Sequence, residues 1–335
     1  MESLDAFIDS LPKAELHLHL EGTLEPELAF ELAARNGVKL RFPSVEALRQ
    51  AYSFADLQSF LDVYYRVAAV LVTERDFRDL AAAYVARAAA DGVKHAEVFF
   101  DPQTHTVRGV SMGTIVRGLQ AGLTDAGAAH RVTTRLILCL LRHLPEDEAL
   151  QTIDEAAPFG DAITAIGLDS SEVGHPPSKF ARAFARARAL GWHAVAHAGE
   201  EGPPAYVWEA LEILRAERID HGVRALEDSA LVERLRRGRV PLTVCPLSNV
   251  KLRVFDRLEA HNLKGLLDQG LVVTINSDDP AYFGGYVGEN YRRVAEALRL
   301  SRSEIAQLAR NSFAASFLPD AEKRRWMAGI DRLEG

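Results

Sequence analysis

The stretch Glu15-Leu-His-Leu-His-Leu-Glu-Gly22 decides how the whole chain is interpreted. Leucines alternate in it with His17 and His19, and a period of two places both imidazoles on one face of a β-strand. Two neighbouring imidazoles supply half of a four-coordinate metal site. The pair is a weak signal by itself, because a strand with two hydrogen-bonded histidines has the same sequence. The rest of the chain must therefore supply the remaining ligands.

Further along the chain, seven more segments have the apolar character of strands, and each is followed by a helical pattern. These predicted strands cover residues 95–100, 132–141, 163–169, 192–197, 218–221, 240–245 and 271–276. Residues 23–91 hold only helical patterns, and further helices are predicted after the last strand at 288–298, 302–313 and 319–329. This order predicts an α/β protein, a (β/α)₈ TIM barrel with a helical insertion after strand one and extra C-terminal helices.

A doubly wound open sheet is the alternative architecture for alternating strands and helices. Such a sheet usually brings a glycine-rich nucleotide loop after an early strand, and this chain has none there. The sequence also shows no internal repeat and no low-complexity linker. We therefore expect residues 1–335 to form a single domain.

Composition narrows the classes of function. The chain is 48% hydrophobic and 26% charged, as in ordinary globular proteins, and its net charge of −8 argues against binding to nucleic acid or to an anionic membrane. Its two cysteines, Cys139 and Cys245, lie in apolar strand-like runs and indicate no disulfide framework. The first residues lack the basic and apolar regions of a secretion signal. We expect a cytoplasmic protein with a small-molecule substrate.

Imidazole and carboxyl groups gather where the predicted strands end, which is where barrel enzymes carry their working groups. His197 ends the fifth strand, and Glu200 follows three residues later. His221 ends the sixth strand, and Asp278 and Asp279 follow the eighth. Each group also has a structural explanation: carboxylates favour helix N-termini, and an Asp before a proline is a common N-cap. Their shared place at strand ends favours a single functional site.

These groups suit metal-assisted chemistry. Three histidines and one carboxylate form a credible ligand set for a divalent transition ion, with zinc favoured and iron or manganese also compatible. One of the two adjacent aspartates can bind the metal while the other faces the substrate, and Asp278 is nearer to the strand end. His221 is placed to steer or deprotonate a water molecule. Glu200, in a water-poor pocket, can stay protonated and act as a general acid.

The motifs resemble those of the adenosine/adenine deaminase family of metal-dependent amidohydrolases. The resemblance spans nearly the whole chain and rests on His17-x-His19, His197-Ala-Gly-Glu200, Ile219-Asp-His-Gly222 and Ser277-Asp-Asp-Pro280. It implies a (β/α)₈ barrel that replaces the amino group at position six of a purine by oxygen and releases ammonia.

The resemblance also implies a role for each site residue. The metal ligands would be His17, His19, His197 and Asp278, holding one Zn²⁺ per chain, with Fe²⁺ or Mn²⁺ as alternatives. Glu200 would protonate N1 of the purine, and His221 would activate the attacking water. Asp279 would hold N7, and the backbone of Gly167 would approach N3. This zinc chemistry differs from that of nucleobase editors, whose Cys-x-x-Cys motif is absent here.

The substrate is expected to be the free base adenine, which would give hypoxanthine in purine salvage. Nucleoside-specific members of the family usually have Asp where this chain has Glu21, and that Asp faces the ribose. The segments 99–105 and 169–179 also look like those of members that act on the free base. Deamination of adenosine or of another 6-aminopurine is the alternative, and a catalytically inactive purine-binding relative is a remote one. The sequence does not indicate the oligomeric state.

Overall fold

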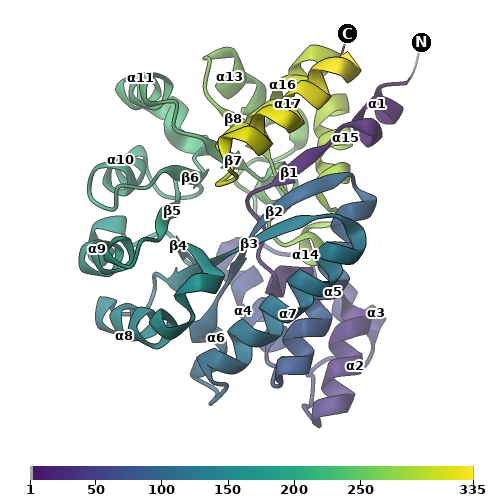
Figure 1. Ribbon diagram of the computed structural model, residues 1–335, viewed down its shortest axis with the longest axis vertical. Helices are drawn as coiled ribbons and strands as arrows, with labels where there is room; N and C mark the ends of the chain where they lie inside the picture. Colours follow the sequence, from purple (N-terminus) through teal and green to yellow (C-terminus); the bar gives the residue numbers. More distant parts are fainter. Residues whose placement is uncertain (1–2, 335) are drawn as a thin grey trace.

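The computed structural model describes residues 3–334, and its centre is a ring of eight parallel strands (Figure 1). Neighbouring strands are hydrogen-bonded in sequence order from β1 to β8, which confirms the predicted barrel. The strands are β1 (Lys13–Glu15), β2 (Val93–Phe100), β3 (Thr133–Leu141), β4 (Ile163–Asp169), β5 (His193–Ala198), β6 (Arg218–His221), β7 (Leu242–Val244) and β8 (Val273–Ile275).

Helices surround this ring and also form the predicted insertion between β1 and β2. The insertion contains α2 (Pro26–Asn36), α3 (Val45–Gln50), α4 (Leu57–Ala68) and α5 (Glu74–Ala90), with α1 (Leu4–Ser10) before the barrel. The later helices are α6 (Pro102–Thr106), α7 (Met112–His130), α8 (Glu146–Ala156), α9 (Ala181–Ala189), α10 (Pro204–Glu212), α11 (Ser229–Gly238), α12 (Pro246–Lys251), α13 (Leu263–Asp268), α14 (Pro280–Phe283), α15 (Val287–Ala297), α16 (Arg302–Ala315) and α17 (Asp320–Glu334).

The histidine stretch is less regular than the sequence predicts. β1 ends at Glu15, so His17 and His19 lie beyond it, and a 3₁₀ turn, η1 (Glu21–Thr23), follows. The backbone of this extension is nevertheless paired on both sides. Asp278 N–H donates to the His17 carbonyl at 3.1 Å, and His19 N–H donates to the Asp278 carbonyl at 3.0 Å. This extension therefore closes the ring between β8 and β2, where Leu20 N–H donates to Phe99 O at 3.0 Å.

The interior of the barrel has three layers along the strands. A small apolar cluster occupies the middle and consists of Phe99, Ile137, Cys139, Ala165 and Val195, with Phe317 packed against it. Period-two alternation along β2 places His95 and Glu97 on the same side as Phe99, towards the amino ends of the strands. The histidines of the opening stretch lie at the carboxyl ends. The apolar cluster thus lies between two buried groups of ionisable side chains, which approach each other at Asp220, 3.8 Å from Arg218 Nε and 3.5 Å from His197 Nδ1.

No helix within residues 3–334 combines the length and the apolar character needed to cross a lipid bilayer.

Candidate active site

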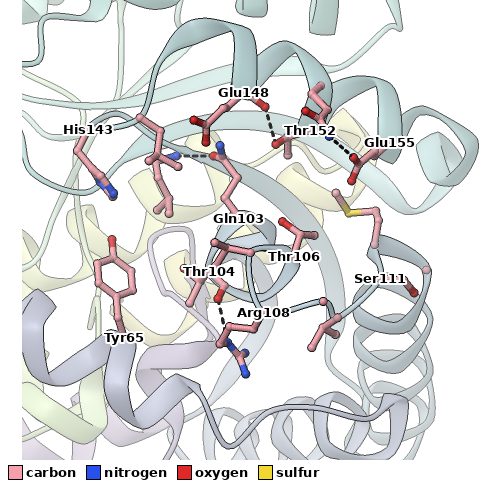
Figure 2. Close-up of a pocket in the computed structure, with 18 residues that line it drawn as sticks. Tyr65, Gln103, Thr104, Thr106, Arg108, Ser111, His143, Glu148, Thr152 and Glu155 are labelled. Carbon is pink, nitrogen blue, oxygen red and sulfur yellow. Dashed lines mark hydrogen bonds between the residues drawn. The ribbon is translucent and has the colours of Figure 1, made fainter.

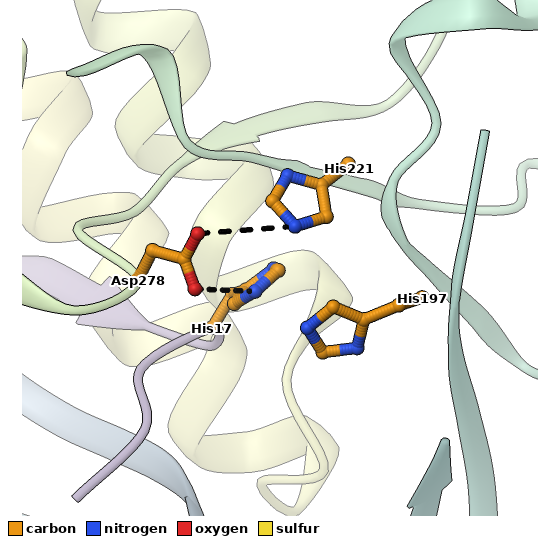
Figure 3. Close-up of side chains that lie close together, drawn as sticks. All are labelled: His17, His197, His221 and Asp278. Atoms are coloured by element: carbon orange, nitrogen blue, oxygen red, sulfur yellow. Dashed lines mark ion pairs between the residues drawn. The ribbon is translucent and has the colours of Figure 1, made fainter. Parts of the chain in front are cut away.

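Four buried side chains meet at the carboxyl ends of the strands (Figure 3). His17 follows β1, His197 lies in β5, His221 ends β6 and Asp278 follows β8. One ligand atom from each lies within 4.8 Å of the others, so the four could hold a metal ion. His221 and Asp278 have backbone φ angles of +64° and +62°, in the left-handed region that residues other than glycine rarely adopt. Backbone strain of this kind is concentrated at functional sites.

His19 brings a fifth donor group, and a fourth imidazole nitrogen, to the same place. Its Nε2 lies 3.2 Å from His197 Nε2 and 3.5 Å from Asp278 Oδ1, and His17 Nε2 lies 3.3 Å from that oxygen. Ligands about 2.0–2.1 Å from a tetrahedral ion are ~3.3 Å apart, so these three spacings fit one shared ion. His221 Nε2 faces the other oxygen, Asp278 Oδ2, at 3.9 Å. The donor set therefore fits a divalent cation, with His17, His19 and His197 around one carboxylate oxygen.

The opposite nitrogens of these rings face carboxyl or carbonyl groups. His17 Nδ1 lies 3.1 Å from the Thr243 carbonyl, and His197 Nδ1 lies 3.5 Å from Asp220 Oδ2. His19 Nδ1 lies 3.5 Å from Asp169 Oδ2. Such partners orient a metal-binding imidazole and select which nitrogen carries its proton. Asp220 and Asp169 lie within segments that the sequence singles out, but only the structure shows that they face the histidines.

Protonation states at the site follow from burial. Burial, reinforced by His17, holds the pKa of His197 and of His221 well below the ordinary histidine value, so both rings are neutral and offer a lone pair. Burial opposes ionisation of Asp278, but the charge of His17 outweighs it and holds the Asp278 pKa well below its usual range. His197 and His221 are thus held towards the neutral form beside an ionised carboxylate, whereas Asp278 offsets the effect of burial on His17 and raises the His17 pKa. A metal requires the deprotonated form of each ligand, so binding of the ion would displace the His17 proton.

Glu200 stands beside this centre in a different state. Its Oε2 lies 3.5 Å from His221 Nε2, while its buried Oε1 makes no hydrogen bond. Burial and the negative charge of Asp278 raise the Glu200 pKa well above the ordinary value. The side chain is therefore a protonated acid that can donate to a ligand in the cavity.

The loop that carries Glu200 is held by Glu172, a residue to which the sequence analysis gave no role. Its carboxylate accepts hydrogen bonds from four consecutive backbone N–H groups, those of residues 199–202, at 2.7–3.1 Å. Arg142 adds a second anchor by donating to the His197 carbonyl at 2.7 Å. The segment 170–177 thus fixes the backbone of the acid.

Asp279 is also buried, and its Oδ1 makes no hydrogen bond. Burial and the adjacent Asp278 raise the pKa of Asp279 well above its usual range, so this carboxyl too can donate a proton to a ligand. Gly22 makes room for it, because a Cβ at position 22 would lie 2.0 Å from Asp279 Oδ1. This close approach explains the glycine of the opening stretch.

Gly167 and Glu21, both expected near the substrate, contact other parts of the protein. At Gly167 a Cβ would lie 2.5 Å from Cys139 Sγ, in the apolar layer of the barrel, and the contact of its backbone with a purine stays a prediction. Glu21 Oε1 accepts from His105 Nε2 at 2.8 Å and from Asp101 N–H at 3.2 Å. The Glu21 carboxylate is therefore held by partners within the protein.

Side chains from the insertion cover the cavity. Leu57, Phe60, Leu61, Tyr64 and Tyr65 of α4 line it together with the catalytic groups. Tyr64 O–H donates to Asp101 Oδ2 at 3.1 Å, and Tyr65 Oη lies 2.9 Å from Ser170 Oγ. The sequence predicts helices in this insertion, but it does not indicate that one of them contacts the site.

A second cavity, of about 860 Å³, shares Tyr65 with the catalytic cavity (Figure 2). It is bordered by α6, the start of α7, and α8, and its polar groups include Gln103, Arg108, His143 and Glu148. None of the ligand or acid residues described above lines it. The smaller cavity at the metal centre is therefore the one equipped for chemistry.

The fold and the site together define a metal-dependent hydrolase barrel of the amidohydrolase type. The adenosine deaminase family model matches residues 12–333, so the chain belongs to that family. It is 64% identical to an adenine deaminase from Streptomyces coelicolor, over 96% of this chain and 95% of that protein.

Solved structures of similar proteins have the same fold. A crystal structure of adenine deaminase from Arthrobacter aurescens superposes with a TM-score of 0.95, at 52% identity over 96% of this chain and 98% of that one. An amidohydrolase from Burkholderia ambifaria, with bound zinc, has a TM-score of 0.91 at 28% identity, over 99% of this chain and 94% of that one.

Proposed function

We propose that this protein hydrolyses adenine to hypoxanthine and ammonia. The observation that carries the proposal is the meeting of the histidine and aspartate ligands with two further buried carboxyl groups, Glu200 and Asp279, in one cavity. The adenine deaminases similar to this chain cover nearly its full length, which supports the free base as substrate.

We assign the metal to His17, His19, His197 and Asp278, and we propose that it is zinc, with iron or manganese as alternatives. The spacings around Asp278 Oδ1 support these four ligands over a set containing His221. When bound, such an ion lowers the pKa of a coordinated water from 15.7 to about 7 and thereby supplies the nucleophile. Zinc in the similar amidohydrolase supports its choice here.

The side chains then move the protons. Glu200 donates its proton to N1 while the water oxygen bonds to C6, and His221 takes one proton from that water. His221 returns the proton to the amino nitrogen, which leaves as ammonia. The oxygen on C6 gives its remaining proton to Glu200, so the acid is restored. Asp279 donates to N7 throughout and orients the ring, and a contact between Gly167 and N3 stays a prediction.

Separate assays with adenine and adenosine test this proposal. We expect the purified, metal-loaded protein to release ammonia from adenine with a kcat/KM far above that for adenosine. Elemental analysis should find one divalent ion per chain. Equal or faster turnover of adenosine would make the protein a nucleoside deaminase instead.

We also propose that the chain forms a single domain and works in the cytoplasm. One continuous hydrophobic core joins α1 near the N-terminus to α17 near the C-terminus, which supports the first statement. Thermal unfolding of the metal-free protein should then show one cooperative transition.

A further inference from the structure

Two carboxyl groups of the catalytic cavity take no part in the proton transfers described above. Asp101 follows β2 and Asp169 ends β4, and each is 2% exposed. Both line the cavity with Glu200 and Asp279. One oxygen of each, Oδ1, is buried and makes no hydrogen bond. A buried acceptor without a donor destabilises the fold, so these oxygens call for a donor supplied by a ligand.

The two groups differ in what holds them. Asp169 directs Oδ2 to His19 Nδ1 at 3.5 Å and so orients a proposed metal ligand. Asp101 is held by Tyr64, whose O–H donates to Oδ2 at 3.1 Å. Its Oδ1 lies 3.9 Å from His19 Nδ1, beyond hydrogen-bonding distance. Asp101 and Asp169 also lie close to each other beside His19, but Asp101 Oδ1 accepts no hydrogen bond there.

The order of strands around the barrel shows which substrate atom this acceptor meets. Glu200 follows β5, His221 ends β6 and Asp279 follows β8, next to which the ring closes through β1 to β2 and Asp101. The edge of a purine runs in the same sense from N1 through C6 to N7, and then to N9 and N3. With N1 at Glu200 and N7 at Asp279, N9 lies on the side of β2 and N3 on the side of β4, which Asp169 ends.

We propose that Asp101 is a specificity-determining residue whose Oδ1 accepts a hydrogen bond from N9–H of the free base. This inference rests on the proposed deamination of adenine. Free adenine carries a proton on N9, whereas a nucleoside carries a sugar carbon there. A 9-substituted purine would leave the buried carboxyl oxygen without a donor, which is the kind of mismatch that discriminates most strongly in binding sites.

This assignment also explains Glu21, at the position where nucleoside-specific members usually have Asp. Glu21 accepts from the backbone N–H of Asp101 and from His105, so it fixes the segment that carries the free-base contact. The longer side chain acts on specificity through Asp101 and makes no substrate contact of its own.

The test is the variant Asp101→Asn, assayed with adenine and with 9-methyladenine. The Tyr64 O–H requires an acceptor, so the amide oxygen turns to Tyr64 and the NH₂ group replaces Oδ1 opposite N9–H. We expect kcat/KM for adenine to fall about 10–100-fold. For 9-methyladenine, kcat/KM, or the inhibition constant if it acts only as a competitive inhibitor, should change less than about threefold. The metal content of the variant should equal that of the wild type.

Tyr64→Phe is the matched control, because it removes the neighbouring hydroxyl and leaves the Asp101 carboxyl. It should retain the preference for adenine over 9-methyladenine to within about threefold. An Asp101→Asn protein with full metal content and an unchanged preference would overturn the assignment. Failure of the proposed function looks different: the wild-type protein itself would then show no preference for adenine over adenosine.

Discussion

The two ends of the barrel interior both bury ionisable groups, and they treat them in opposite ways. At the amino ends, Glu97 accepts from Arg218 Nη1 at 2.6 Å, lies 3.0 Å from His95 Nε2, and accepts from the backbone N–H of Phe317. Arg218 also donates to the Leu16 carbonyl at 3.1 Å. Both oxygens of Glu97 are therefore satisfied, and its charge is balanced.

The carboxyl ends hold more acids than bases, and several of their polar atoms lack partners. His17 Nε2, Asp101 Oδ1, Glu200 Oε1 and Asp279 Oδ1 are all buried without a hydrogen bond. A structural cluster would not leave so many groups unpaired, because each destabilises the fold. Arg218 Nε at the amino ends also lacks a hydrogen-bond partner, but both oxygens of its neighbour Glu97 have donors. The comparison teaches that carboxyl oxygens buried without a donor, rather than burial of charge, mark the end of this barrel that binds ligands.

The largest effect should come from removing the shared metal ligand. Asp278→Asn replaces the ionised oxygen that faces His17 and His19 and should abolish metal binding. We expect kcat to fall by more than about 10³-fold, because the ion contributes several kcal/mol to the transition state. Elemental analysis and steady-state kinetics check this. A fully active variant with its ion retained would remove Asp278 from the ligand set.

Removal of the general acid should lower kcat nearly as much as removal of the metal ligand, but the metal should stay bound. Glu200→Gln keeps the shape of the side chain and removes its proton, so kcat should fall about 10²–10⁴-fold. Glu201→Gln is the matched control, since its side chain is partly exposed and it makes no contact in the cavity. Near-normal turnover by Glu200→Gln would refute its role as acid.

A substitution at the amino ends of the strands, where Glu97 and Arg218 pair, should change the stability of the protein and not its activity. Glu97→Gln removes the hydrogen-bonded counter-charge of the buried Arg218, leaving Asp220 at 3.8 Å as the nearest carboxylate, and should lower the free energy of unfolding by about 3–5 kcal/mol. Urea unfolding measures this, and kcat per folded molecule should change little. Asp147→Asn, which breaks the exposed pair with Arg182, should cost less than about 1 kcal/mol.

The smallest expected effect is a difference in pH dependence between the same two proteins. Burial would raise the Glu97 pKa, but Arg218 and His95 together lower it to about 2. Because the folded-state pKa lies below the unfolded value, the stabilisation is complete above about pH 4.5 and is lost as the pH falls towards 2. The difference in unfolding free energy between wild type and Glu97→Gln should thus be about 2 kcal/mol smaller at pH 3 than at pH 6. An equal difference at both pH values would contradict this charge balance.

The order of strands and most of the metal centre could be predicted because both depend on short-range patterns. Apolar runs and helical periods marked the eight units, and His197, His221 and Asp278 stood at strand ends. The carboxyl ends of parallel strands share one rim, so this local position already implied proximity. The exact end of β1 was wrong, because the extension that carries His17 pairs only through isolated bridges.

The walls of the cavity depend on contacts between distant segments, and the sequence by itself left them open. Asp101 and Tyr64 are brought together across 37 positions, and Glu172 reaches the backbone of Gly199 across 27. Glu21 pairs with His105 across 84, which only the packing of the insertion could decide. The sequence alone therefore determined which groups do chemistry, because repeating units place them on one rim. The tertiary structure decided which groups hold and select the substrate, because the docking of α4 and the loops sets their directions.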